Sequence, residues 1–425
     1  MQILPPPGPL RKRGVTEGLS NSGRRQVGLA PSSPAGCLDL LAEMIRIDSV
    51  NSAISGRARA EEDLAEYIEE QARLFGLGVR RMPVPGQADN LLITCDRSAA
   101  SPWLLFESHM DTVGVEGMNI EPFAPNVDGR AVHGRGSCDT KGSGAAMLWA
   151  LRTYASASLG SANVALLFTV DEEVSRSGIN AFVREQLPTL PWRPVGAIVG
   201  EPTGLRLVTA HRGAARMAIR TEGVAAHSSD PSRGRSAIRM MMPILEAVEN
   251  RYIPSLTATH PLCGPAVCSV NLIRGGSQIN IIAQSCEIQI DRRTVPGEEA
   301  SDVVATISRL LSELRAADPA QNYAVRELLM YEPLDPATSA EFALQLGALL
   351  ESMGLSGEPT GAGYGSHAGT LASAGMPAVV FGPGDIAQAH TADEWLNLDQ
   401  LEQAVDVYLA IMQADVSLWP RRTVL

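Results

Sequence analysis

The chain has 425 residues, of which 45% are hydrophobic and 19% are charged, a balance typical of globular proteins. Its formal net charge is -12, which argues against nucleic-acid binding because such binding normally needs a basic face. No stretch reaches the ~18 to 20 apolar residues that would span a bilayer, so no membrane partner is expected. The length exceeds what one ordinary core accommodates, which predicts two domains.

Residues 1–35 carry basic residues with no apolar run after them, a pattern that does not fit a secretory signal. A disordered extension is favoured over an organelle transit peptide, because Pro5, Pro6, Pro7 and Pro9 would break an amphipathic helix. The six cysteines are scattered and form no CxxC pair. They indicate reduced thiols in a cytoplasmic protein rather than a disulfide scaffold or a thiolate zinc site.

Predicted helices and strands alternate along most of the chain after residue 36. Apolar residues have helical spacing over 37–47 and 59–78, and a third helix is predicted over 141–157. Short apolar runs of strand length are found at 90–95, 103–108, 164–170, 197–200 and 378–382. This alternation predicts an α/β fold with a mostly parallel sheet that is flanked by helices.

The middle of the chain has a different order of elements. Its predicted elements are the strand 212–223, the helix 235–252, the strands 266–275 and 279–293, the helix 297–317 and the strand 322–330. The order β-α-β-β-α-β is that of a ferredoxin-like unit. We therefore expect an extension over 1–35, a catalytic domain in two segments, 36–206 and 327–425, and an inserted domain over 207–326.

Residues of the types that commonly bind metals, histidine, aspartate and glutamate, follow four of the predicted strands. They are His109 and Asp111 after the second strand, Glu172 and Glu173 after the third, Glu201 after the fourth and His390 shortly after the fifth. In open α/β sheets, ligands bind at the carboxyl ends of the strands. A further candidate, Asp139, lies in a glycine-rich turn before the predicted helix 141–157.

Two histidines with several carboxylates suit zinc, cobalt or manganese. The predicted ligands of two such ions are His109, Asp139, Glu173, Glu201 and His390. Metal ions at this place would activate a water molecule, and Glu172 is the predicted base that takes its proton. Asp111 is predicted to hydrogen-bond the imidazole of His109.

Each of these residues also has a simpler explanation. The run 171–173 would fit a solvated charged surface, His390 would fit a buried histidine with a satisfied hydrogen bond, and Asp139 would fit a helix cap. The metal site is favoured because all the candidates fall at equivalent places in the predicted fold.

Seven motifs follow one another along the chain: ESHMDTV, GRGSCDTKGSGAA, DEEVSRSG, VGEPT, HSSDPSRGRSAI, INIIA with IDRRTVPG, and FGPGDIAQAHTADEWL. In this order they resemble the motifs of a superfamily of di-zinc metallopeptidases. This superfamily includes acetylornithine deacetylase, succinyl-diaminopimelate desuccinylase, aminoacylase and glutamate carboxypeptidase. The resemblance runs from about Gly36 to the C-terminus, and the last motif is most similar to acetylornithine deacetylase-like members.

The resemblance implies how the metal ligands divide between two zinc ions. One ion would be held by His109, Asp139 and Glu201, and the other by Asp139, Glu173 and His390, so that Asp139 bridges them. The resemblance also implies that Glu172 is the general base, that Asp111 orients His109 and that the Asp139–Thr140 peptide bond is cis.

The resemblance further implies three residues that would meet the substrate. His227, in the inserted domain, would stabilise the oxyanion. In the family, this histidine reaches across a homodimer into the active site of the partner subunit. Whether it acts in cis or in trans is not fixed by the sequence. Asn280 and Arg293 would bind the substrate carboxylate, since the planar fork of an arginine pairs bidentately with a carboxylate. The adjacent Arg292 would point to the other face of its strand.

Some positions depart from the family pattern. Gly114 stands where proline is common, and His367 stands where acetylornithine deacetylase-like sequences usually have an acid, after a small residue at Ser366. The resemblance places Ser366 and His367 near the substrate pocket. A neutral histidine there would not favour a cationic substrate side chain such as that of ornithine.

The predicted function is that of a homodimeric amidohydrolase with two zinc ions, for which cobalt could substitute. Its predicted substrate is a small molecule, an N-acyl amino acid, as for acetylornithine deacetylase. One alternative is a dipeptidase or carboxypeptidase of the same superfamily. Another is a catalytically inactive binding protein, against which the intact set of metal-binding residues argues.

Overall fold

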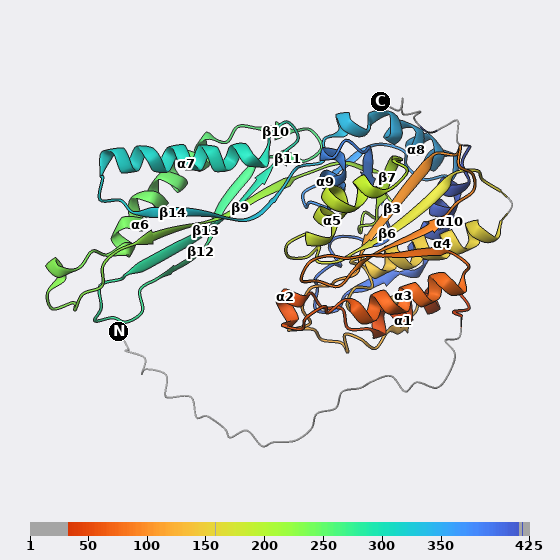
Figure 1. Cartoon of the computed structure of the whole chain (residues 1–425), viewed down its shortest axis with the longest axis horizontal. Coiled ribbons are helices and arrows are strands. Elements are labelled where there is room, and N and C mark those ends of the chain that lie inside the picture. The colour runs from red at the N-terminus through yellow and green to blue at the C-terminus, as the bar shows by residue number, and fades with distance from the viewer. Residues whose placement is uncertain (1–32, 158, 416–418, 420–425) are drawn as a thin grey trace, which may run out of the picture. The chain divides into compact units, whose positions relative to one another are not determined.

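A computed structural model describes residues 33–157, 159–415 and 419 of the chain. The predicted N-terminal extension therefore lies almost entirely outside the described residues. The largest sheet has the strand order β1-β2-β6-β3-β7-β16-β8-β15 (Figure 1). Its strands are β1 (Gly78–Met82), β2 (Asn90–Cys95), β3 (Trp103–His109), β6 (Asn163–Thr169), β7 (Pro194–Val199), β8 (Val208–His211), β15 (Thr360–Ala362) and β16 (Ala378–Val380). The predicted α/β fold with a largely parallel sheet is confirmed, since β6, β3, β7 and β16 run parallel at its centre.

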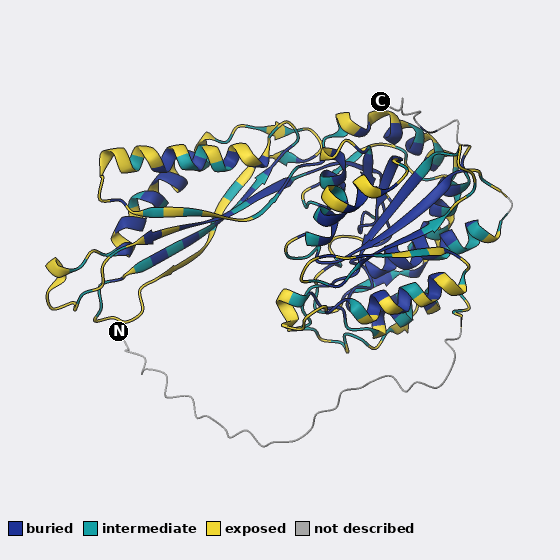
Figure 2. Cartoon of the chain, in the orientation of Figure 1, coloured by how far each residue is buried: buried dark blue, intermediate teal, exposed yellow. Residues whose placement is uncertain are grey.

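Helices cover both faces of this sheet, and the sheet is dark blue throughout its centre in Figure 2. Leu104 and Phe106 of β3 pack on one side and Leu105 packs on the other, as alternation in a strand requires. The first side is covered by α1 (Cys37–Arg46), α3 (Glu62–Leu74), α4 (Lys141–Ser156), α8 (Ala340–Ser352) and α10 (Leu398–Gln413). The second side is covered by α5 (Ser177–Ala181) and α9 (His367–Ser373).

The middle of the chain forms a four-stranded antiparallel sheet with the order β12-β13-β9-β14. Its elements are β9 (Gly213–Glu222), α6 (Ala237–Ala247), β12 (Val267–Gly275), β13 (Ser285–Thr294), α7 (Ala300–Ala317) and β14 (Tyr323–Tyr331). The predicted β-α-β-β-α-β order is confirmed. Alternate residues of β13, such as Ile288 and Ile290, pack against α6 and α7, and the opposite face carries half-buried residues such as Asp291 and Arg293.

The strand pairing refines where the inserted unit begins and ends. Strand β8, which starts at Val208, pairs with β15 and β16 of the large sheet rather than with the four-stranded sheet. Strand β14 extends to Tyr331, beyond the predicted end of the insertion at residue 326. The domain limits themselves stay a prediction.

A third sheet, which the sequence patterns did not predict, has the strand order β17-β5-β4. Its strands are β4 (Asn126–Asp128), β5 (Ala131–His133) and β17 (Trp395–Asn397). Their three-residue length is too short to produce a clear alternation of polar and apolar residues. Glu394, which immediately precedes β17, contacts the turn that carries Asp139. Within the described part of the chain, no helix is long and apolar enough to cross a membrane.

Candidate metal centre

The predicted metal-binding residues lie at the carboxyl ends of neighbouring parallel strands. His109 is the last residue of β3 and pairs in register with Thr169, the last residue of β6. Glu172 and Glu173 lie in the loop that follows β6, and Glu201 follows β7, which pairs with β3 on its other side. Parallel pairing therefore brings these segments to one edge of the sheet, as the sequence predicted.

Asp139 lies between two histidines. Its Oδ1 atom is 3.1 Å from Nε2 of His109, and its Oδ2 atom is 3.2 Å from Nε2 of His390. The same nitrogen of His390 is 3.1 Å from Oε1 of Glu173. Possible ligand atoms of His109, Asp139 and Glu173 all lie within 4.8 Å of one another. The bridging role of Asp139 stays a prediction, whereas its peptide bond to Thr140 is cis, as the resemblance implied.

The centre contains more buried negative charge than its two histidines can balance. Burial, together with the charge of Asp139, raises the pKa of Glu173 to about 7 and that of Glu201 well above its usual range. Hydrogen bonds from His390 to Asp139 and Glu173 raise the pKa of this histidine to about 11. Carboxylates that crowd together in this way are stabilised by bound cations. The donor set, two imidazoles with three carboxylates, therefore fits two divalent metal ions.

Asp111 holds both His109 and the loop that carries the two glutamates. The backbone carbonyl of Asp111 accepts from Nδ1 of His109 at 2.9 Å, and the carboxylate lies 3.4 Å from the same nitrogen. The carboxylate also accepts hydrogen bonds from the backbone N–H groups of Glu172, at 2.9 Å, and Glu173, at 3.0 Å. Burial alone would raise the pKa of Asp111, but the hydrogen bonds from His109 and its other donors outweigh burial and lower it. The predicted role of Asp111 in orienting His109 is consistent with these contacts.

Asn51, which sequence reasoning did not single out, contacts the candidate centre. Its Nδ2 group donates to Asp111 at 2.8 Å and to Asp171 at 2.9 Å, so it joins the two loops behind the metal ligands. Its Oδ1 atom accepts from the N–H of Ala53 and caps the short helix α2 (Ser52–Ser55). The available signal was an asparagine at a helix N-cap position, which is too common to indicate a catalytic site.

Glu394 was also missed, and it fixes the turn that carries Asp139. Its carboxylate accepts from the backbone N–H groups of Gly136, Cys138 and Asp139 and forms a buried ion pair with Arg135. Because all these donors converge on one side chain, the position of Asp139 depends on a residue that is 255 positions away in the sequence.

Glu172, the predicted base, is paired with Arg176. Its Oε1 atom accepts from Nη2 of Arg176 at 2.6 Å, and the two side chains are only 10% and 5% exposed, respectively. Arg176 has a left-handed backbone conformation, with φ of 57°, as do Asp171 and His390. Such conformations are uncommon for residues other than glycine and cluster at functional sites.

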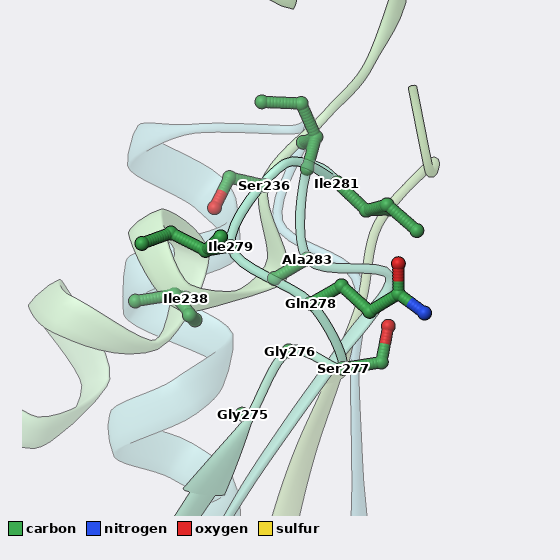
Figure 3. Close-up of a pocket in the computed structure, with 10 residues that line it drawn as sticks. Ser236, Ile238, Gly275, Gly276, Ser277, Gln278, Ile279, Ile281 and Ala283 are labelled. Carbon is green, nitrogen blue, oxygen red and sulfur yellow. The ribbon is translucent and has the colours of Figure 1, made fainter. Parts of the chain in front are cut away.

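The predicted substrate residues of the four-stranded unit fall into two groups. His227 and Asn280 are exposed neighbours, since the N–H of Ser228 donates to the carbonyl of Asn280. Asn280 belongs to a loop that lines a surface hollow of about 520 Å³ together with residues such as Ser236 and Ile238, which Figure 3 shows. The residues that line this hollow are polar or apolar and carry no charge.

Arg293 forms the second group with Asp291. Its guanidinium pairs with this carboxylate at 3.0 Å and donates to the hydroxyl of Tyr331 at 2.9 Å. Arg292 points to the opposite face, as predicted, where it is buried and contacts Tyr252. Among the hydrogen bonds of the described residues, none joins His227, Asn280 or Arg293 to a predicted metal ligand.

Ser366 and His367 are both fully buried. The hydroxyl of Ser366 accepts from the N–H of Ala368 and caps α9, while Nδ1 of His367 lies 2.8 Å from Oε1 of Glu107. The structure thus gives both side chains partners within the protein. Their predicted contact with substrate stays a prediction.

Known proteins are similar to this chain over most of its length. The chain is 28% identical over 392 residues to the acetylornithine deacetylase of Erwinia tasmaniensis, covering 88% of this chain and 96% of that protein. Its fold is similar to that of an M20 family metallo-carboxypeptidase, Sso-CP2 from Sulfolobus solfataricus, with a TM-score of 0.71, 16% identity and coverage of 89% and 98%.

A second similar fold is that of the YxeP protein of Bacillus subtilis, described as a dinuclear metal-binding peptidase from the M20 family. The TM-score is 0.66 with 13% identity, and the similarity covers 89% of this chain and 96% of that one. Residues 105–414 match the model of peptidase family M20/M25/M40. This match includes the strand ends that carry His109, Glu173 and His390, so the chain belongs to peptidase family M20/M25/M40 and is a hydrolase of amide bonds.

Proposed function

We propose that the chain is an amidohydrolase with two metal ions that removes the acyl group from an N-acyl amino acid, as an acetylornithine deacetylase does. The observation that carries this proposal is the cluster of His109, Asp139, Glu173 and His390 beside the buried carboxylate of Glu172. The similarity to the Erwinia tasmaniensis deacetylase over most of both chains supports the choice of substrate class.

The proposed ligands are divided as follows: His109, Asp139 and Glu201 for one ion, and Asp139, Glu173 and His390 for the other. Metal ions bound there, zinc in the first place and cobalt as a substitute, would polarise the amide carbonyl and lower the pKa of a bound water. Glu172 takes a proton from the attacking water and delivers it to the leaving amine. Asp111 contacts Nδ1 of His109, so that Nε2 of this histidine stays directed at Asp139.

The remaining groups would bind substrate. Arg293 and Asn280 would hold its carboxylate and His227 would stabilise the oxyanion that develops during attack. In the structure Arg293 is already paired with Asp291, so a substrate carboxylate would have to compete with this partner.

The test is the release of free amine from N-acetyl-L-ornithine, measured beside other N-acyl amino acids and a panel of dipeptides, with added zinc or cobalt and with chelator. Cleavage of N-acyl amino acids that chelator abolishes would support the proposal. Preferred cleavage of dipeptides would instead identify a dipeptidase or carboxypeptidase with the same metal chemistry. Glu172→Gln should retain its metal and lose about 100- to 10,000-fold in kcat. Activity near that of the unmodified enzyme in this variant would disprove the mechanism.

We also propose that the chain forms a homodimer through the four-stranded unit. Strand β12 lies at an edge of this sheet, where it exposes Val267, Leu272 and Ile273, and the neighbouring helix α6 exposes Ile238 and Met242. An exposed strand edge with apolar side chains favours pairing with a second chain.

Mixing two inactive variants, Glu172→Gln and His227→Ala, tests the dimer and the role of His227 together. If His227 serves the partner's site, a mixed dimer contains one complete site and activity returns. If His227 serves its own site, no mixed dimer has a complete site and the mixture stays inactive. A chain that stays monomeric at full activity would rule out the trans arrangement.

A further inference from the structure

Arg176 is held on several sides by the protein itself. Its Nη2 group donates to Glu172 at 2.6 Å and to the carbonyl of Gly365 at 2.9 Å, and its Nη1 group donates to the carbonyl of Ser366 at 3.0 Å. The residue is 4% exposed. A guanidinium that is fixed by two carbonyl groups is a rigid anchor, because its planar fork loses little further freedom when it binds a carboxylate.

The aromatic ring of Tyr331 covers the same guanidinium. The Cζ atom of Arg176 lies 3.6 Å from the ring centroid, close enough for a cation–π contact. Gly365 leaves room for this ring, since a Cβ atom at that position would lie 2.3 Å from Cε2 of Tyr331. The stack thus depends on a glycine as well as on the two aligned side chains.

The hydroxyl of Tyr331 has a different partner. It accepts a hydrogen bond from Nη1 of Arg293 at 2.9 Å. The ring of Tyr331 therefore contacts Arg176, the arginine that holds the proposed base. The hydroxyl of Tyr331 contacts Arg293, the arginine proposed for the substrate carboxylate. Tyr331 is the last residue of β14, and Arg293 lies near the end of β13.

We propose that Arg176 is a positioning residue for Glu172, and that Tyr331 links it to Arg293, with the ring supporting turnover and the hydroxyl supporting substrate binding. This inference rests on the proposed function, in which Glu172 is the base and Arg293 binds the carboxylate. A glutamate side chain has many rotamers, and the anchored guanidinium selects those in which the carboxylate lies beside the metal ligands. The hydroxyl of Tyr331 orients one edge of Arg293, whose charge a substrate carboxylate would share with Asp291.

Two substitutions at Tyr331 separate the two contacts. Tyr331→Phe keeps the ring and removes only the hydroxyl, so KM for the amino acid substrate should rise about three- to tenfold, the effect of one lost hydrogen bond, without a matching fall in kcat. Tyr331→Leu removes the ring as well, so kcat should fall in addition. The matched control is Tyr323→Leu, because Tyr323 lies on the same strand and its ring covers Arg315 at 4.0 Å.

Substitutions at Arg176 test the anchor directly. Arg176→Met should lower kcat at least tenfold, since part of the effect of the base is lost, while metal content and KM stay close to those of the unmodified enzyme. Arg176→Lys keeps the charge and should recover part of kcat. The exposed Arg184 provides the control variant Arg184→Met. Metal analysis and thermal unfolding of each variant show whether it is folded and loaded.

The outcomes are distinguishable from a failure of the proposed function. If Glu172→Gln is inactive but a folded, metal-loaded Arg176→Met has unchanged kcat, the positioning role is wrong. If Tyr331→Phe and Tyr331→Leu change kcat and KM in the same proportion, the division between ring and hydroxyl is wrong. If Glu172→Gln itself remains active, the assignment of the base fails and the contacts of Arg176 have another purpose.

Discussion

The Nδ1 atom of His367 lies 2.8 Å from Oε1 of Glu107, and each of the two side chains is 1% exposed. The same glutamate oxygen accepts a hydrogen bond from the hydroxyl of Thr169 at 2.6 Å. This pair explains why a histidine stands where the family resemblance implied an acid. An acid at position 367 would place a second carboxylate against a buried one. Glu107 therefore accounts for Nδ1 of the histidine, while the buried Nε2 atom has no hydrogen-bond partner among the described residues.

The first prediction concerns this pair. His367→Asp should lower the free energy of unfolding by about 3 to 5 kcal/mol, because it leaves buried charge without a partner. The double variant His367→Asp with Glu107→Gln should recover much of the loss, since only one carboxylate then remains. Chemical denaturation of the four proteins in a double-mutant cycle measures the coupling. A strictly additive result would show that the two residues do not interact.

A second prediction concerns Asn51, which donates to Asp111 and Asp171. Asn51→Ala should weaken metal binding about 10- to 100-fold, because the support of the ligands is lost although no ligand is removed. Competition with a chelator of known affinity measures this change. Asn397→Ala is the control, since Asn397 also caps a helix, α10, but does not contact the centre. Equal metal affinity in the two variants would remove Asn51 from the support of the site.

A third prediction is the pH dependence contributed by His211. Burial, helped by the charge of Arg176, lowers the pKa of this histidine to about 3 from its usual 6.5. Its Nδ1 group donates to the carbonyl of Arg212, and its Nε2 atom accepts from the N–H of Gly369. The folded protein therefore favours the neutral form, whose stabilising effect is complete above pH 6.5 and is lost as the pH falls towards 3.

The measurement is the free energy of unfolding between pH 7 and pH 4 for the unmodified chain and for His211→Gln, which cannot titrate. Over this range the unmodified chain should lose stability more steeply than the variant, by up to ~1.4 kcal/mol per pH unit. Parallel curves would mean that His211 is not the group responsible.

A fourth prediction concerns removal of the metal. Chelation should lower the Tm, because ions that bind only the folded chain stabilise it, and zinc or cobalt should restore it. Metal analysis should give about two ions per chain, the number expected for a bridged centre. Asp139→Asn should reduce this content, whereas Asp128→Asn, at an exposed carboxylate of β4, should not. A Tm that is insensitive to chelator would contradict the proposed centre.

Much of the fold was predictable because long elements carry a clear pattern. The helix predicted over 37–47 is α1, and the apolar strands that end near His109, Glu172 and Glu201 were all recognised. The positions of metal-binding residues after these strands then followed from the geometry of a parallel sheet.

The features that were missed depend on contacts between distant segments. Strand β1 lies at an edge of the large sheet and contains two arginines, so its sequence is typical of a charged loop. In the fold, Arg81 pairs with Glu62 and Glu69 of α3. Glu394 and Asn51 act through hydrogen bonds to segments far away in the sequence. No local pattern marks such residues, because their partners are only brought together by the completed fold.

The order of strands in the large sheet has a consequence for synthesis of the protein. Strand β16, at residues 378–380, lies between β7, which ends at Val199, and β8, which ends at His211, so both neighbours are made long before it. The four-stranded unit is continuous in sequence from Gly213 to Tyr331 and can fold as soon as it leaves the ribosome. The large sheet stays incomplete between β7 and β8 until β16 has been made, and His390 is made later still. Nascent chains that stop before Ala378 should therefore be unable to retain metal at the complete centre and should be recognised by chaperones.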